Sequence, residues 1–172
     1  MKKTHVPQDS APGMSHQGRH ERFLKTWEHG AHKAKSKLPE PTACPGCDAV
    51  YHQGRWQWSP VPADAQHHLC PACQRIRDRA PVGYLHLSGK FFDQHRDEIM
   101  RLVRHVEMRE KNQHPLERIM DVSEDQDGTL ISFTGPHLTR GAGEAINHAY
   151  QGELDFHYVE EDITMRVKWH RD

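Results

Sequence analysis

Two C-x-x-C pairs constrain the fold of this chain more than any other feature of its sequence. Each pair forms a short turn that places two sulfurs side by side, and two such turns separated by 22 residues supply the four thiolates of a tetrahedral zinc site. Proline followed by glycine or alanine inside each pair favours the tight turn. The sequence therefore predicts a zinc ribbon with a structural zinc ion. The predicted ligands, which are all four cysteines of the 172-residue chain, are Cys44, Cys47, Cys70 and Cys73.

Other uses of paired cysteines fit this sequence less well. Asp48 and Gln74 follow the two pairs, where a c-type haem site requires histidine. A nucleic-acid deaminase needs a His-x-Glu motif before its cysteines, but the stretch His105-Val106-Glu107 follows both pairs. A thioredoxin-like dithiol would use one pair beside a βαβ pattern. The alternative that stays open is a redox-sensing zinc switch.

The polar composition limits the size of any one hydrophobic core. Mean hydropathy is −0.91, only 35% of the residues are hydrophobic and 27% are charged. These values favour small modules with a solvated segment over one large core. Apolar runs are far shorter than the ~18 residues of a transmembrane helix, and no apolar signal-peptide region follows the basic start. We therefore expect a cytoplasmic protein without a membrane partner.

Charge is distributed unevenly along the chain, although the formal net charge is only −1. Residues 1–40 carry eight basic and four acidic side chains, whereas residues 116–172 carry five basic and twelve acidic ones. A polyanion such as RNA would therefore be attracted to the front half of the chain and repelled by the back half. The acidic back half is instead a candidate surface for a protein partner.

Composition and periodicity divide the chain into four ranges, and the fold class that they predict is α+β. Residues 1–40 form a basic tail, which is either disordered and solvated or an arm that folds on RNA. Residues 41–87 form the zinc ribbon, with a β-hairpin after the first cysteine pair. Residues 88–115 carry apolar side chains at helical spacing, which predicts a linking amphipathic helix. Residues 116–172 predict a small ββαββ module with an antiparallel sheet.

Basic and aromatic side chains around the cysteine pairs are candidate RNA contacts. If the segment after the second pair is extended, its three arginines align along one edge and can contact phosphates, and the alternative is a solvated charged loop. The two tryptophans share one face of their strand, where they either stack on bases or fill the small core of the ribbon. The candidate RNA-binding residues are Arg55, Trp56, Trp58, Arg75, Arg77 and Arg79.

Catalytic motifs are not recognisable in this sequence. It lacks a Walker motif, a Gly-x-Ser-x-Gly motif and a His-Glu-x-x-His motif. The stretch Gly141-Ala142-Gly143 lies within a helical apolar pattern, so it is weak evidence for a phosphate-binding loop. We therefore expect a non-enzymatic protein, with an enzyme whose site has no recognisable motif as the alternative.

Several short sequence segments outside the cysteine pairs resemble those of a known family. Together with the two pairs, they make residues 40–170 resemble a bacterial family of uncharacterised zinc-ribbon proteins. That family is in turn similar to the N-terminal region of the Nmd-three large-subunit export adaptors. The resemblance implies zinc binding and association with ribosomal or other RNA. The segments are Tyr84-Leu85-His86-Leu87-Ser88-Gly89, His114-Pro115-Leu116-Glu117-Arg118-Ile119, His137-Leu138-Thr139-Arg140 and Ala149-Tyr150-Gln151-Gly152-Glu153-Leu154.

Two hypotheses of different functional class follow from the sequence. The first is a non-enzymatic zinc-ribbon protein that associates with RNA or the ribosome. The alternative is a regulatory adaptor between proteins, in which zinc is purely structural and no nucleic acid is bound. Salt-dependent RNA binding distinguishes the two, because contacts with phosphates weaken steeply as ionic strength rises.

Overall fold

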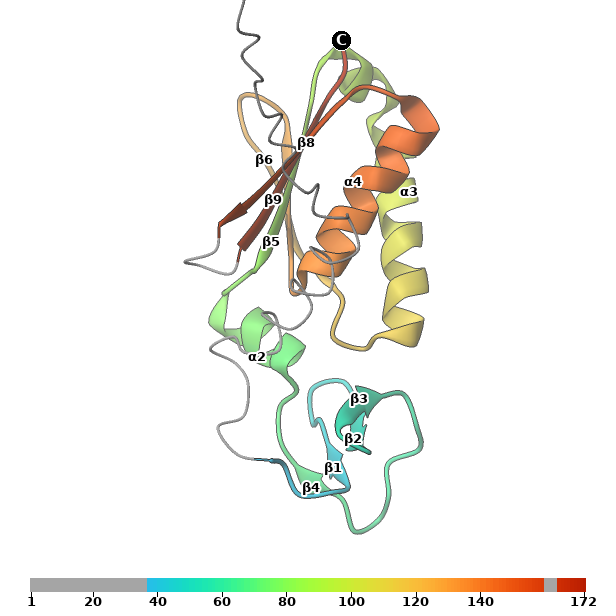
Figure 1. Ribbon diagram of the computed structural model, residues 1–172, viewed down its shortest axis with the longest axis vertical. Helices are drawn as coiled ribbons and strands as arrows, with labels where there is room; N and C mark the ends of the chain where they lie inside the picture. The colour runs from blue at the N-terminus through green and yellow to red at the C-terminus, as the bar shows by residue number, and fades with distance from the viewer. Residues whose placement is uncertain (1–36, 160–163) are drawn as a thin grey trace, which may run out of the picture. The chain divides into compact units, whose positions relative to one another are not determined.

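The computed structural model describes residues 37–159 and 164–172. All of these residues belong to one compact unit, Ala31–Asp172. Within it, the structure has an α+β architecture with two sheets, as the sequence predicted (Figure 1). The predicted basic tail lies almost entirely outside the described residues. None of the helices in the described ranges combines the length and the apolar character needed to cross a bilayer.

The first sheet supports the cysteine pairs, and it has the strand order β3-β2-β1-β4. β2 and β3 form the predicted hairpin, and Gln53 and Gly54 turn between them with positive φ. β1 pairs in parallel with β4, and the register sets Ala43 opposite His67. Because each cysteine pair closely follows one of these parallel strands, both pairs emerge at the same end of the sheet. The strands are β1 (Thr42–Ala43), β2 (Val50–His52), β3 (Arg55–Gln57) and β4 (Gln66–His67).

The second sheet has five strands in the order β6-β7-β5-β9-β8. Its central strand β5 pairs antiparallel with β7 and parallel with β9, so the sheet is mixed. The prediction of an antiparallel sheet formed by residues 116–172 alone is therefore wrong. The sheet is mixed, and its central strand β5 comes from the range 41–87 that we assigned to the ribbon. The strands are β5 (Gly83–Ser88), β6 (Ile119–Glu124), β7 (Thr129–Phe133), β8 (Glu153–Val159) and β9 (Thr164–His170).

Two helices cover one face of the second sheet, where they lie side by side (Figure 1). The helix α3 (Lys90–Gln113) begins after Gly89, whose φ of 102° favours glycine. The helix α4 (Pro136–Tyr150), which is the helix of the predicted ββαββ pattern, begins at Pro136, where the fixed φ of proline suits the first helical position. Between the sheet and these helices lies a core whose largest fully buried side chains include Trp169, Phe92, Phe133, Leu85, Leu87, Ile99, Ile131, Leu138 and Ile146.

Glycines allow α4 to lie unusually close to the sheet. A Cβ atom at Gly83 in β5 would lie only 1.7 Å from the Thr139 hydroxyl oxygen, and one at Gly143 in α4 would lie 2.6 Å from Val167. Neither contact is sterically possible for a larger residue without movement of the helix. Gly143 of the Gly141-Ala142-Gly143 stretch is thus explained by packing.

Candidate metal centre

The four cysteines form a tight cluster of sulfur atoms. Their Sγ atoms all lie within 4.8 Å of one another, and those of Cys47 and Cys70 are 3.8 Å apart. A zinc ion with Zn–S bonds of about 2.3 Å in a tetrahedron requires sulfurs separated by about 3.8 Å. The prediction that these cysteines come together is therefore confirmed, and the cluster could hold a metal ion. Four sulfur ligands suit zinc best among the common structural metals.

Local backbone structure places each pair of sulfurs. In the first pair, the Asp48 amide donates to the Cys44 carbonyl at 2.8 Å, and Asp48 adopts a φ of 62°, which reverses the chain. In the second pair, Cys70 is the N-cap of α2 (Pro71–Asp78), and its Sγ accepts from the Cys73 amide at 3.4 Å. The pairs also contact each other, because the Cys70 amide donates to Cys44 Sγ at 3.2 Å. Such N–H···S contacts stabilise thiolate charge.

Gly46 in the first turn leaves room for the opposite pair. A Cβ atom at this position would lie 3.1 Å from Cys73 Sγ and 3.3 Å from the Leu69 side chain. A larger residue would therefore press on a ligand atom of the cluster. The glycine between Cys44 and Cys47 thus serves the approach of the two turns, in addition to the turn itself.

The sulfurs also differ in their tendency to ionise. The pKa of Cys47 is lowered to about 4 by a hydrogen bond from the Cys70 thiol and by the Arg118 guanidinium, which together outweigh its partial burial. The pKa of Cys70 is raised, because its thiol donates to Cys47 and because it is buried. The pKa of Cys73 is raised as well, chiefly by burial. A metal ion binds thiolates, so its binding would release the protons that these sulfurs retain.

Arg118 is a further residue of the centre, and our sequence analysis missed it. Its guanidinium donates to Cys47 Sγ at 3.0 Å, to Cys73 Sγ at 3.4 Å and to Cys70 Sγ at 3.9 Å. The residue is only 7% exposed. Burial lowers its pKa, but the neighbouring sulfurs raise it by more, so that the net shift is upward. The available signal was a Glu117-Arg118 pair between the apolar residues Leu116 and Ile119 at the start of the predicted ββαββ module.

The donor set determines what this centre can do chemically. Four thiolates complete a tetrahedral coordination shell, whereas a catalytic zinc site keeps a position open for water or substrate. Among the described residues, this cluster is the one group of at least three possible metal ligands whose donor atoms converge. The arrangement is therefore that of a structural metal site.

The arginines after the second pair do not form the extended phosphate-binding edge, which was one of our two interpretations of this segment. Pro71 at the first helical position and Cys70 at the N-cap begin a helix there, α2. On a helix, residues two apart point in nearly opposite directions, so the middle arginine of the three cannot share a face with the other two. The prediction of an aligned edge is therefore wrong, because local capping signals outweigh the alternation of arginines.

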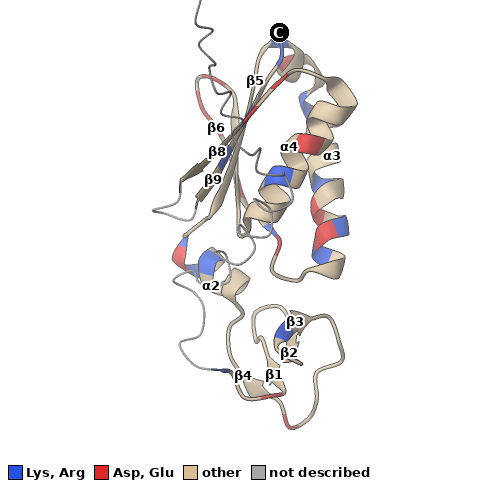
Figure 2. Ribbon diagram, viewed as in Figure 1, with Lys and Arg blue, Asp and Glu red and all other residues tan. Residues whose placement is uncertain are grey.

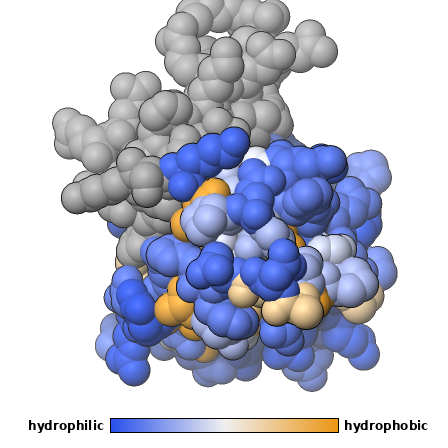
Figure 3. All heavy atoms as spheres, turned by 90° about the horizontal axis from the view of Figure 1, so that it is seen from below, coloured by the Kyte–Doolittle hydropathy of each residue, from blue (hydrophilic) through white to orange (hydrophobic). Residues whose placement is uncertain are grey.

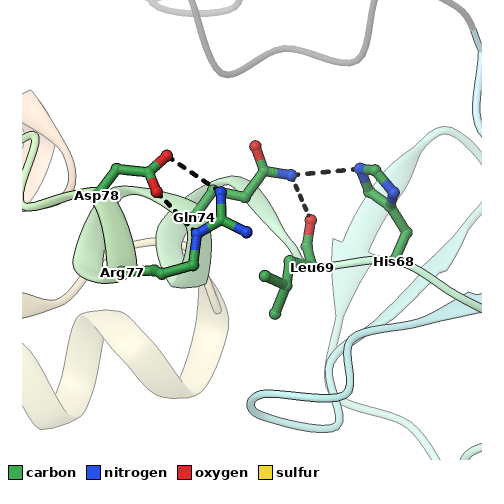
Figure 4. Close-up of polar contacts among 5 residues, drawn as sticks. All are labelled: His68, Leu69, Gln74, Arg77 and Asp78. Carbon is green, nitrogen blue, oxygen red and sulfur yellow. Dashed lines mark hydrogen bonds and ion pairs between the residues drawn. The ribbon is translucent and has the colours of Figure 1, made fainter.

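The three arginines also have different environments. Arg75 is 8% exposed and donates to the Ala80 carbonyl at 3.5 Å. Arg77 is exposed and forms a two-pronged ion pair with the adjacent Asp78, at 2.7 and 3.2 Å (Figure 4). Arg79 is exposed and ends α2 in a left-handed conformation. Figure 4 also shows Gln74, which donates to the Leu69 carbonyl and contacts His68, so that α2 is fixed to the chain before it.

The two tryptophans have different roles in the structure. Trp56 packs on the small core around the cysteines, and its ring centroid lies 5.6 Å from that of Tyr51. Trp58 is 39% exposed, and its indole nitrogen donates to the carbonyl of Lys111 in α3 at 2.6 Å. Its ring also lies 5.9 Å from the Arg118 guanidinium. Trp56 therefore fills the small core of the ribbon, which was one of its two predicted roles. Trp58 instead links the ribbon to α3.

The surface around the centre is mixed in charge and hydropathy. Arg55 in β3 is exposed. Figure 2 shows basic residues on β3 and α2, and both signs of charge along α3. The space-filling view from the ribbon end shows apolar spots separated by hydrophilic side chains (Figure 3). The exposed large apolar residues include Trp58, Val61 and Ile76.

Comparisons with known proteins identify no relative. A scan against protein-family models and searches of curated proteins and of solved structures all find no match to this chain. The resemblance to the export-adaptor family therefore stays a prediction.

Proposed function

We propose that this chain is a non-enzymatic zinc-ribbon protein that associates with RNA or the ribosome, with zinc in a structural role. The observation that carries the proposal is the cluster of four sulfurs within 4.8 Å of one another. A closed set of four thiolates stabilises a fold and offers no position for substrate. The function of such a ribbon therefore lies in the surface that it holds in place.

Exposed basic and aromatic groups near the centre support RNA as the partner. Arg55 lies between the two cysteine pairs and Arg79 follows the second pair. Both are exposed, and neither forms an ion pair with an acidic residue within the described ranges. Trp58 exposes part of its ring, which can stack on a base. The acidic range 116–172 would repel a polyanion, so we assign the contact to the ribbon.

The alternative function is an adaptor between proteins, and the environments of Arg75 and Arg77 favour it. Arg75 is buried, and the charge of Arg77 is offset by Asp78. These environments leave fewer groups for phosphate contacts than the sequence suggested. A surface with few free cations and several exposed apolar side chains suits a protein partner.

Salt-dependent RNA binding by the zinc-loaded full chain tests the proposal. We expect the double variant Arg55→Ala/Arg79→Ala to lower the slope of log affinity against log salt by about two, or about one per lost phosphate contact. Arg109→Ala, which removes an exposed arginine of α3, is the matched control and should leave the slope unchanged. Co-sedimentation with ribosomes gives a second readout. Binding that does not respond to salt, or no binding at all, would favour the adaptor.

A further inference from the structure

We propose that Arg118 couples metal binding to the order of the second sheet, by fixing the segment 115–119 against the thiolates. In this proposal Arg118 is a positioning residue, because it acts on the sulfurs that hold the metal. The inference rests on the metal binding proposed above and is independent of RNA binding. Its consequence is that removal of the metal loosens contacts well outside the ribbon.

On the side of the second sheet, the segment 115–119 is held by three different elements. The Arg118 amide donates to the hydroxyl of Thr134, which follows β7, at 2.8 Å, and the Thr134 amide donates back to the Arg118 carbonyl at 2.9 Å. The Ile119 amide donates to the Glu107 carboxylate of α3 at 2.7 Å. The Glu117 carboxylate accepts from the Leu138 amide, in the first turn of α4, at 2.9 Å.

On the side of the metal centre, the same segment reaches three of the four sulfurs. The Arg118 guanidinium contacts Cys47, Cys70 and Cys73, and its Nε atom donates to the Pro115 carbonyl at 2.8 Å. Leu116 packs against the apolar cluster that contains Cys44 and Cys70. Five consecutive residues therefore touch the metal ligands, both helices α3 and α4, and the end of β7.

Charge explains why the metal would affect this segment. A zinc ion with four thiolates carries a net charge of −2, and a buried guanidinium beside it compensates part of that charge. When the metal leaves, its four sulfurs are no longer held at the corners of one tetrahedron. The buried Arg118 guanidinium then loses the fixed set of thiolates that compensates its charge, which is unfavourable. We therefore expect the segment to leave its site and its hydrogen bonds to open.

Hydrogen exchange on the full-length wild type tests the coupling without a substitution. We expect the amides of Arg118, Ile119, Thr134 and Leu138 to exchange at least about tenfold faster after a chelator removes zinc, because their partners depend on the segment. Amides shared between β8 and β9, at the far edge of the sheet, are the internal reference and should change little. Unchanged exchange at the four amides in zinc-free protein would overturn the proposal.

Zinc affinity of Arg118 variants tests the residue itself. Arg118→Met keeps an unbranched side chain in the buried position but removes its charge and its donors, and we expect zinc affinity in competition with a chelator to fall about 10–100-fold. Arg118→Lys keeps the charge without the planar fork and should recover part of that loss. Arg109→Met, an exposed position on α3, is the matched control and should bind zinc like wild type.

Spectroscopy distinguishes an effect on the sulfurs from a general loss of stability. With Co²⁺ as the probe, the thiolate-to-metal absorption bands should shift in Arg118→Met and stay unshifted in Arg109→Met, because the Arg118 side chain donates hydrogen bonds to the sulfurs and is lost only in the first variant. If Arg118→Met does not fold, the Lys variant and the wild-type exchange experiment decide. Wild-type zinc affinity and bands in Arg118→Met would overturn this inference alone. A wild type that binds no zinc would overturn the proposed function as well.

Discussion

The two sheets of this chain are stabilised by different means. The first sheet has strands of two or three residues, and its core cluster consists of Cys44, Ala49, Cys70 and Ala72. The second sheet has strands of five to seven residues and buries a large apolar core beneath two helices. Each large side chain in such a core contributes about 1.5–3 kcal/mol. The comparison teaches that a region too small to bury a core can still fold where ligands for a metal are fixed by its turns.

Loss of the metal should produce the largest difference in stability between the two regions. A structural zinc contributes on the order of 10 kcal/mol to the folding of a small domain. We therefore expect Cys70→Ser to unfold the ribbon, while the β8–β9 edge of the second sheet stays folded. Residue-resolved hydrogen exchange measures this difference, and metal analysis should find one zinc per wild-type chain. A ribbon that stays folded without metal would contradict the comparison.

A substitution that creates a cavity next to β5 should destabilise the second sheet and leave the metal centre intact. Leu85 is fully buried in the central strand, so Leu85→Ala should lower the free energy of unfolding by about 2–5 kcal/mol. Ile76→Ala, at an exposed position on α2, is the control and should have a small effect. Chemical denaturation measures both variants, and zinc affinity is measured beside them. If Leu85→Ala weakened zinc binding as much as it weakened the sheet, β5 would belong with the ribbon after all.

Glu117 should make the stability of the second region depend on pH. The carboxylate is only 3% exposed, and burial raises its pKa from 4.5 to about 7, while the Leu138 amide acts in the opposite direction and Glu110 adds repulsion. A folded-state pKa above the unfolded one gives stability that is complete below pH 4.5 and is lost as the pH rises to about 7.

Glu117→Gln removes this loss, because a glutamine stays neutral while its oxygen can still accept from Leu138. We therefore expect the variant to match the wild type near pH 4.5 and to exceed it by about 3 kcal/mol above pH 7. Unfolding of both proteins at each pH is the measurement, and their difference cancels the common effect of pH on metal binding. Parallel stability curves would show that the pKa of Glu117 is the same in the folded and the unfolded protein.

The smallest expected effect is at the contact between the regions. Trp58→Phe keeps an aromatic ring but removes the N–H group that donates to the Lys111 carbonyl, and we expect a loss of about 1 kcal/mol. The unfolding transitions of the two regions should also become less coupled. A calorimetric melt shows both effects, with Trp58→Tyr as a second variant that lacks the indole N–H. An unchanged melt would mean that this hydrogen bond contributes nothing to the contact.

Features set by local chemistry could be predicted from the sequence by itself. The four ligands follow from the spacing within two tight turns, because each turn places its own two sulfurs. The hairpin at Gln53 and Gly54, the helix starting at Pro136 and the strands that follow it rest on turn residues and on periods of two or 3.6. All of these signals lie within a few neighbouring residues, so they can be read without knowledge of the fold.

Only the tertiary structure decided which distant segments meet. The sequence of β5 is compatible with a short strand, but it does not indicate which sheet that strand joins. Its place between β7 and β9 depends on hydrogen bonds with residues far along the chain. Arg118 lies 45 residues from Cys73 and 71 from Cys47, so no spacing rule connects it to the centre. Its role arises because the segment that leads into β6 passes beside the cysteine turns, where the sulfurs compensate the charge of a buried guanidinium.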